Sequence, residues 1–161
     1  MSSILSFVVF FAIILAVASS GAVFKPGSWY ESLEKPGWNP PNWAFPVVWS
    51  ALYVMIAIAG WRVYEAAGLV TLPFLAYGVQ LALNAAWSAL FFGMRRPGLA
   101  FADVLAMWVA VAINALLFYP IDAIAGLLMI PYLIWVTIAS CLNFSVWRRN
   151  PGAFRPAAVN G

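Results

Sequence analysis

The sequence predicts an all-α integral membrane protein built as one bundle of five transmembrane helices. The chain has 161 residues, of which only 8% are charged, and its mean hydropathy is +0.94. A bilayer core about 30 Å thick is crossed by about 20 apolar residues. Five apolar stretches reach that length and leave nothing for a soluble domain, so residues 1–161 form a single membrane domain. The predicted spans are 3–24, 43–64, 72–93, 99–119 and 123–147.

The first stretch is predicted to stay as a span and not to be cleaved as a signal peptide. No Lys or Arg precedes it, and its apolar run of about 20 residues is longer than that of a typical signal peptide. The other boundaries follow from residues that stop or cap helices. Gly68 and Pro73 mark the turn into the third span, Pro97 precedes the fourth, Pro120 ends it, and Asp122 suits the N-cap of the fifth.

Residues 25–42 form the one long loop between spans, and they predict a stiff lid or an interfacial belt. Prolines fix φ and reduce the entropy of the unfolded chain, so this loop should be stiffer than its length suggests. One short helical turn is expected at 31–35. Aromatic residues in a nearly neutral segment suit either the membrane interface or a cover over the bundle. The prolines and aromatics concerned are Pro26, Pro36, Pro40, Pro41, Trp29, Tyr30, Trp38 and Trp43.

The distribution of charge predicts that the N-terminus lies outside and the C-terminus in the cytoplasm. Cytoplasmic segments of membrane proteins carry an excess of Lys and Arg. Segments 25–42, 94–98 and 148–161 hold seven of the eight basic residues, Arg155 included, whereas the opposite side carries Arg62 alone. The net charge of +3 is therefore a membrane signal and does not indicate nucleic-acid binding.

Composition excludes several kinds of chemistry. The chain has no histidine and one cysteine, Cys141, which excludes His-based metal sites, a Ser-His-Asp triad and an internal disulfide. Asp103 is the only acidic residue inside a predicted span, about one turn from its start, whereas coupled pumps usually place ionisable groups near mid-bilayer. We expect no metal and no required cofactor, and we expect function in the bundle core or in the 25–42 loop.

The third span carries a stripe of polar and aromatic residues. Spacings of 3, 4, 3 and 4 place its members on one helical face. The stripe consists of Tyr77, Gln80, Asn84, Trp87 and Phe91. Gln80 and Asn84 are predicted to face the interior, because an unpaired amide in lipid is costly. Two interpretations stay open: interhelical hydrogen bonds worth about 0.6 kcal/mol each, or a polar handle within an aromatic pocket.

Aromatic residues of the second and fifth spans lie at a matching depth. Trp49 lies about 9 Å below the start of its span, Asn84 about 13 Å from the end of the third, and Trp135 about 18 Å from the end of the fifth. All three fall in the cytoplasmic half of the bilayer, beneath the 25–42 loop. We expect a pocket for a flat apolar ligand, with a purely structural aromatic core as the alternative. Candidate lining residues are Trp49, Tyr53, Gln80, Asn84, Trp87, Trp135, Ala139 and Leu142, and the same faces of the second and fifth spans also carry Phe45 and Tyr132.

A stripe of small residues lies on another face of the third span. Ala85, Ala89 and Gly93 recur at spacing four, a pattern that lets helices approach closely in lipid. The stripe predicts either packing within the monomer, with the first span as candidate partner, or the seam of a homodimer.

Several motifs together resemble one known family, over about residues 20–149. In chain order they are Trp29-Tyr30, Lys35-Pro36-Gly37-Trp38-Asn39-Pro40-Pro41, Val48-Trp49-Ser50-Ala51-Leu52-Tyr53, Gln80-Leu81-Ala82-Leu83-Asn84 with Trp87, Phe91-Phe92-Gly93, Pro131-Tyr132-Leu133-Ile134-Trp135 and Leu142-Asn143-Phe144. The combination resembles the TspO/MBR family, called tryptophan-rich sensory protein in bacteria and translocator protein in mitochondria. The nine tryptophans suit that description.

The resemblance implies a five-helix bundle that often dimerises and that binds porphyrins such as protoporphyrin IX, isoquinoline or benzodiazepine-type drugs and, in some members, cholesterol. It implies a bacterial membrane, or the mitochondrial outer membrane for a eukaryotic member. Phe144 stands where the proposed cholesterol pattern has Tyr, which argues against cholesterol and for a bacterial-type member. The pocket residues it implies are Tyr30, Trp38, Trp49, Tyr53, Asn84, Trp87, Trp135 and Ala139.

We favour a tetrapyrrole-binding sensor or regulator in the membrane. One alternative is a transporter of porphyrins or other amphipathic or sterol molecules, although the sequence shows neither two gates nor a charged pathway. Another is light-dependent porphyrin degradation, for which the resemblance implicates Trp49 and Trp135; no acid, base, metal or nucleophile constellation supports ordinary catalysis. A scaffold whose aromatic residues merely pack is the fourth possibility.

Overall fold

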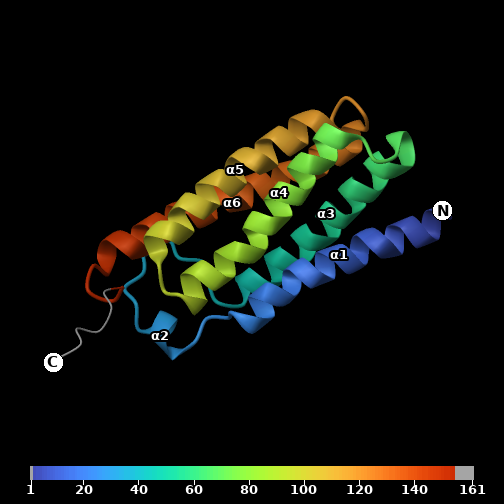
Figure 1. The fold of residues 1–161 in the computed structure, drawn as a ribbon. Coiled ribbons are helices and arrows are strands. Elements are labelled where there is room, and N and C mark those ends of the chain that lie inside the picture. The colour runs from blue at the N-terminus through green and yellow to red at the C-terminus, as the bar shows by residue number, and fades with distance from the viewer. Residues whose placement is uncertain (1, 155–161) are drawn as a thin grey trace.

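The computed structural model describes residues 2–154 and shows the predicted all-helical bundle (Figure 1). Within that range, five helices are long and apolar enough to cross a membrane, and the chain is a multi-pass integral membrane protein. A short helix lies in the loop after the first, and the third long helix ends in a π-helical segment. The elements are α1 (Ser3–Val23), α2 (Ser28–Glu31), α3 (Ala44–Ala67), α4 (Thr71–Ser88), η1 (Ala89–Gly93), α5 (Pro97–Phe118) and α6 (Ala123–Arg149).

The five long helices alternate in direction, so α2, the start of α5 and the end of α6 share one end of the bundle, called the loop end below (Figure 1). The start of α1 lies at the opposite end. Helix α5 packs against α6 and α4, while α1 packs against α3 and α4. Large apolar side chains stay exposed on these helices, such as Ile4 at 79% and Leu116 at 75%, as expected where lipid replaces water. Arg155, which the charge count included, lies outside the described residues.

Close packing of α3 on α1 and α4 depends on Gly60. A Cβ there would lie 2.7 Å from Cζ of Tyr77 and 2.9 Å from Cδ1 of Phe10, closer than side chains pack. The Tyr77 hydroxyl donates to the carbonyl of Ile56, one turn before Gly60, at 2.9 Å. Because Gly60 has no side chain, the Tyr77 ring packs directly against the backbone of α3.

Helix α4 does not stay α-helical to its end, which the sequence did not predict. From Ala89 to Gly93 the backbone forms a π-helix, and the Met94 amide donates to the carbonyl of Ala89 at 2.7 Å. A π turn widens the helix by one residue. It brings both Phe91, which is buried, and Phe92, which is half-buried, against the ring of Tyr30 in the loop.

The helical turn in the 25–42 loop lies at Ser28–Glu31, earlier than the expected 31–35. Gly27 is extended and precedes the turn, and Ser32 caps its end. A residue before proline avoids the α conformation, so Pro36 disfavours a helix reaching Lys35. Of this loop, Tyr30, Leu33 and Pro36 are buried against the bundle.

The predicted N-cap of α6 is confirmed. The Asp122 carboxylate accepts from the Ala125 amide at 2.8 Å, and it also receives two hydrogen bonds from the Arg62 guanidinium, at 3.0 and 2.8 Å. This ion pair joins the end of α3 to the start of α6 at the end away from the loop. Helix α6 then continues through Pro131 to Arg149.

Gly60→Ala should destabilise the protein by about 1–3 kcal/mol, because the added methyl group overpacks the contact with Tyr77 and Phe10. Thermal unfolding in detergent micelles measures the loss. Gly78→Ala is the matched control, since a Cβ at Gly78 meets nothing within 4 Å. Gly78→Ala should leave the unfolding temperature unchanged or raise it. Equal losses at positions 60 and 78 would contradict the packing role of Gly60.

The hydrogen bonds from Arg62 hold the pKa of the Asp122 carboxyl below its ordinary range. A carboxyl with a lowered folded-state pKa contributes stability above its unfolded-state pKa, and this contribution is lost as pH falls through the folded-state pKa. The midpoint temperature of thermal unfolding of the wild-type protein should therefore fall when the pH is lowered beyond about 4. Asp122→Asn and Arg62→Gln should lower the unfolding temperature at pH 7 and make it depend less on pH in the acidic range. If the unfolding temperature of Asp122→Asn fell with acid as steeply as that of the wild type, the ion pair would not be its cause.

Candidate ligand site in the bundle core

A chain of buried hydrogen bonds joins three helices at the centre of the bundle. The Tyr53 hydroxyl of α3 donates to Oδ1 of Asn84 on α4 at 3.0 Å. Asn84 Nδ2 donates to the Tyr132 hydroxyl of α6 at 2.8 Å, and that hydroxyl donates to Oε1 of Gln80 at 2.9 Å. Gln80 and Tyr132 are fully buried and Asn84 is 4% exposed, which confirms that both amides face the interior.

Aromatic rings from α3 and α6 surround this polar chain. Trp49 stacks on Tyr53 with ring centroids 5.4 Å apart, and its edge meets Tyr132 at 6.1 Å. Phe45, one turn before Trp49, meets Trp135 edge to face at 5.8 Å. The two predicted aromatic faces and the Asn84 amide therefore belong to one cluster, in which Trp49 and Trp135 are each half-buried.

Three buried polar atoms near this level have no hydrogen-bond partner among the described residues. They are Nε1 of Trp135, Nε2 of Gln80 and Oδ2 of Asp103. Buried N–H groups in native proteins are almost always paired, and an unpaired one costs about 1–3 kcal/mol. The indole N–H of Trp135 is thus a free donor for an acceptor atom that residues 2–154 do not supply.

Trp87 makes a structural contact that links the core to the loop end. Its indole Nε1 donates to Oδ1 of Asn143 at 3.1 Å, and Nδ2 of Asn143 donates to the carbonyl of Pro97 at 3.0 Å. The Trp87 ring stacks on Phe91 at 5.3 Å. Asn143 was not among the predicted site residues, although a lone amide within the apolar end of the fifth span was the signal for it.

The remaining predicted site residues, two in the loop and two on α6, differ in how far they are buried. Tyr30 is 5% exposed and contacts Phe92 at 5.4 Å, and burial raises the pKa of its hydroxyl. Leu142 of α6 is buried in one cluster with Tyr30, Leu33 and Phe91, against which Phe45 and Trp87 also pack. Trp38 is 53% exposed. Ala139 is half-buried on α6.

The small-residue stripe of α4 meets α1 within the chain at one of its members. A Cβ on Gly93 would lie 2.8 Å from Cδ1 of Phe24, which follows α1. Ala85 and Ala89 are half-buried. These positions accord with the intramolecular alternative at Gly93, and the homodimer seam stays a prediction.

Two surface hollows are lined by no residue of the aromatic cluster. One of about 420 Å³ is lined by Phe144, Trp147, Arg148 and Pro151 at the loop end. The other, of about 280 Å³ at the opposite end, is lined by Trp61, Arg62, Glu65, Ala66 and Asp122. Toward the loop end, Phe45 and Trp87 pack against the buried residues Tyr30, Leu33, Phe91 and Leu142. A ligand that enters the aromatic cluster from that end has to displace these side chains or the loop.

Comparison with known proteins decides the family. The model of the TspO/MBR family matches residues 7–148, nearly the whole chain. The chain belongs to the TspO/MBR family. Protein CrtK of Rhodobacter capsulatus is 43% identical over 93% of this chain and 96% of its own length. The tryptophan-rich sensory protein of Cereibacter sphaeroides is 45% identical over 89% and 90% of the two chains, and the human translocator protein is 38% identical over 77% and 76%.

Membership of the TspO/MBR family confirms the resemblance drawn from the motifs. It places the chain among membrane proteins named for sensing and translocation, with bacterial relatives such as CrtK aligned along almost their full length. The buried hydrogen-bond chain and its aromatic surround thus occupy the core of a TspO/MBR bundle.

Tyr132→Phe should destabilise this TspO/MBR protein by about 1–3 kcal/mol, because it strands Gln80 Oε1 and Asn84 Nδ2 in the core without their shared partner. Tyr53→Phe strands a single acceptor, Asn84 Oδ1, at the part-buried end of the hydrogen-bond chain and should cost less than Tyr132→Phe. Thermal unfolding of both variants in the same detergent gives the comparison. A Tyr53→Phe loss as large as the Tyr132→Phe loss would show that the Tyr132 hydroxyl is not the central link.

Proposed function

We propose that this TspO/MBR protein binds a flat, largely apolar tetrapyrrole of the protoporphyrin IX type in the aromatic core beneath the 25–42 loop, and acts as a membrane sensor or regulator. The observation that carries the proposal is the unpaired indole N–H of Trp135 inside the cluster of Trp49, Tyr53 and Phe45. Aromatic walls with few polar groups suit flat ligands, which stack on rings and use one or two hydrogen bonds for orientation.

The charge of the loop end supports the same class of ligand. Porphyrins of this type combine an apolar macrocycle with carboxylates at one edge. Lys35 Nζ lies 4.7 Å from the centroid of the Tyr30 ring, and Arg95 Cζ lies 4.9 Å from that of Trp29. A macrocycle among the core aromatics would direct its carboxylates toward these cations, where the desolvation cost of the charge is small.

Titration of the purified protein with protoporphyrin IX tests the proposal. Wild-type protein should show saturable quenching of tryptophan fluorescence, and the paired change Trp49→Ala with Trp135→Ala should abolish saturable binding. Trp135→Phe keeps the ring and removes the N–H, so affinity followed by porphyrin absorbance should fall about 5-fold, as expected for one hydrogen bond.

Trp61→Phe is the matched control, because Trp61 lies at the end of the bundle away from the loop, where its indole donates to the Ser3 carbonyl. It should leave porphyrin affinity unchanged. Unchanged affinity in the Trp49 and Trp135 double variant, or equal losses at Trp61 and Trp135, would overturn the assignment of the site.

A further inference from the structure

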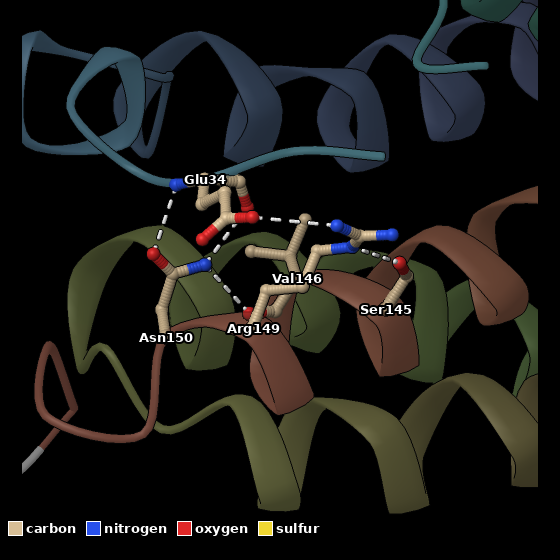
Figure 2. A network of polar contacts seen from close by, with 5 residues as sticks. All are labelled: Glu34, Ser145, Val146, Arg149 and Asn150. Carbon is tan, nitrogen blue, oxygen red and sulfur yellow. Dashed lines mark hydrogen bonds and ion pairs between the residues drawn. The ribbon is translucent and has the colours of Figure 1, made fainter. Parts of the chain in front are cut away.

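One side chain after the last transmembrane helix clamps the middle of the 25–42 loop (Figure 2). Oδ1 of Asn150 accepts from the main-chain amide of Glu34 at 2.8 Å, and Nδ2 of Asn150 donates to the main-chain carbonyl of Glu34 at 2.8 Å. The same Nδ2 donates to the carbonyl of Val146 in the last turn of α6 at 2.8 Å. The carboxamide thus engages both polar groups of one loop residue, much as a neighbouring β-strand would.

Asparagine is matched to this position. Its amide has one acceptor oxygen and a nitrogen with two donors, and all of these are used. Aspartate would lose both donors, and alanine would lose every contact. Asn150 is held in place because it caps α6, where Pro151 follows and the bond to Val146 satisfies a carbonyl of the last turn.

The clamp acts on an exposed residue that lies between two buried residues of the loop. Leu33 and Pro36 are buried on either side of Glu34, so the loop descends to the bundle at that point. The nearby ion pair is weaker: Arg149 lies 3.4 Å from the Glu34 carboxylate, and the two side chains are 45% and 67% exposed. Exposed pairs of this kind contribute about 0–1 kcal/mol. Among the polar contacts at Glu34, the two main-chain bonds of Asn150 are therefore stronger than the ion pair.

We propose that Asn150 is the positioning residue that fastens the 25–42 loop shut, and that release of its clamp on Glu34 controls passage of ligand into the core. The second half of this statement rests on the proposed function. Tyr30 and Leu33 of the loop are buried in the group of residues against which Phe45 and Trp87 pack, so a ligand approaching from this end has to displace the loop. The clamp joins the loop to the end of α6, the helix that also carries Tyr132 and Trp135, so the lid is tied to a wall of the site.

Hydrogen exchange of the loop amides tests the clamp without any ligand. In Asn150→Ala, exchange of the Glu34 amide and its neighbours at 30–35 should speed up at least 10-fold relative to wild type. Glu34→Ala is the matched control, because it deletes the carboxylate of the ion pair and keeps both main-chain groups that Asn150 holds; its exchange should stay within about 2-fold of wild type. Exchange in Asn150→Ala that equals wild type, or a larger effect in Glu34→Ala, overturns the proposal.

Asn150→Asp guards against an uninformative folding defect, because it keeps the size of the side chain. It replaces the two donors with an acceptor oxygen and adds a negative charge beside the carbonyls of Glu34 and Val146. It should also speed exchange at 30–35, while exchange in the middle of α3 and α5 stays at the wild-type rate. Faster exchange spread evenly over all helices would show a general loss of stability, and would count against a clamp specific to the loop.

Stopped-flow mixing with protoporphyrin IX tests the gating. A loosened lid should raise the association and dissociation rates together, each at least 3-fold in Asn150→Ala, with a smaller change in the dissociation constant. A merely structural role for Asn150 would weaken affinity through dissociation alone, and that result would overturn the gating. Absence of porphyrin binding by the wild type would reject the proposed function, and the exchange measurement would still decide the clamp.

Discussion

The Tyr132 hydroxyl is the constraint on which the architecture of the core depends. It accepts from Asn84 and donates to Gln80, so a single oxygen from α6 bonds two amides of α4. In lipid, helices gain no hydrophobic energy from meeting one another, and their register is set by packing and by such internal bonds. These bonds fix α4 relative to α6. Helix α3 then packs against both, because Trp49 contacts the Tyr132 ring and the Tyr53 hydroxyl donates to Asn84.

Most of the fold and the level of the site could be predicted from the sequence. Spacings of 3 and 4 placed Gln80 and Asn84 on one face, and counting residues from the helix ends brought Trp49, Asn84 and Trp135 into the same half of the bilayer. These are properties of single helices with known rise and period. The cost of an unpaired amide in lipid then decides which way the face turns.

What the sequence did not reveal depends on contacts between distant segments. Nothing local distinguishes Asn150 from any other residue that caps a helix; its role arises only because Glu34 lies beside it in space. Asn143 likewise gains its meaning from Trp87 and from the carbonyl of Pro97. The exposure of Trp38, which the motif match set among pocket residues, is also decided by how the whole loop lies on the bundle.

The π-helical turn at Ala89–Gly93 has a consequence for how α4 meets the rest of the molecule. An inserted residue rotates everything after it by about 100° relative to an uninterrupted α-helix. Before the π-helical turn, Gln80 and Asn84 of α4 face the bundle core and bond to Tyr132. After it begins, Phe91 and Phe92 contact Tyr30. Because of the widened turn, the residues before it face the bundle core while the residues after it face Tyr30 in the loop. A continuous α-helix would not present both sets of side chains in these two directions.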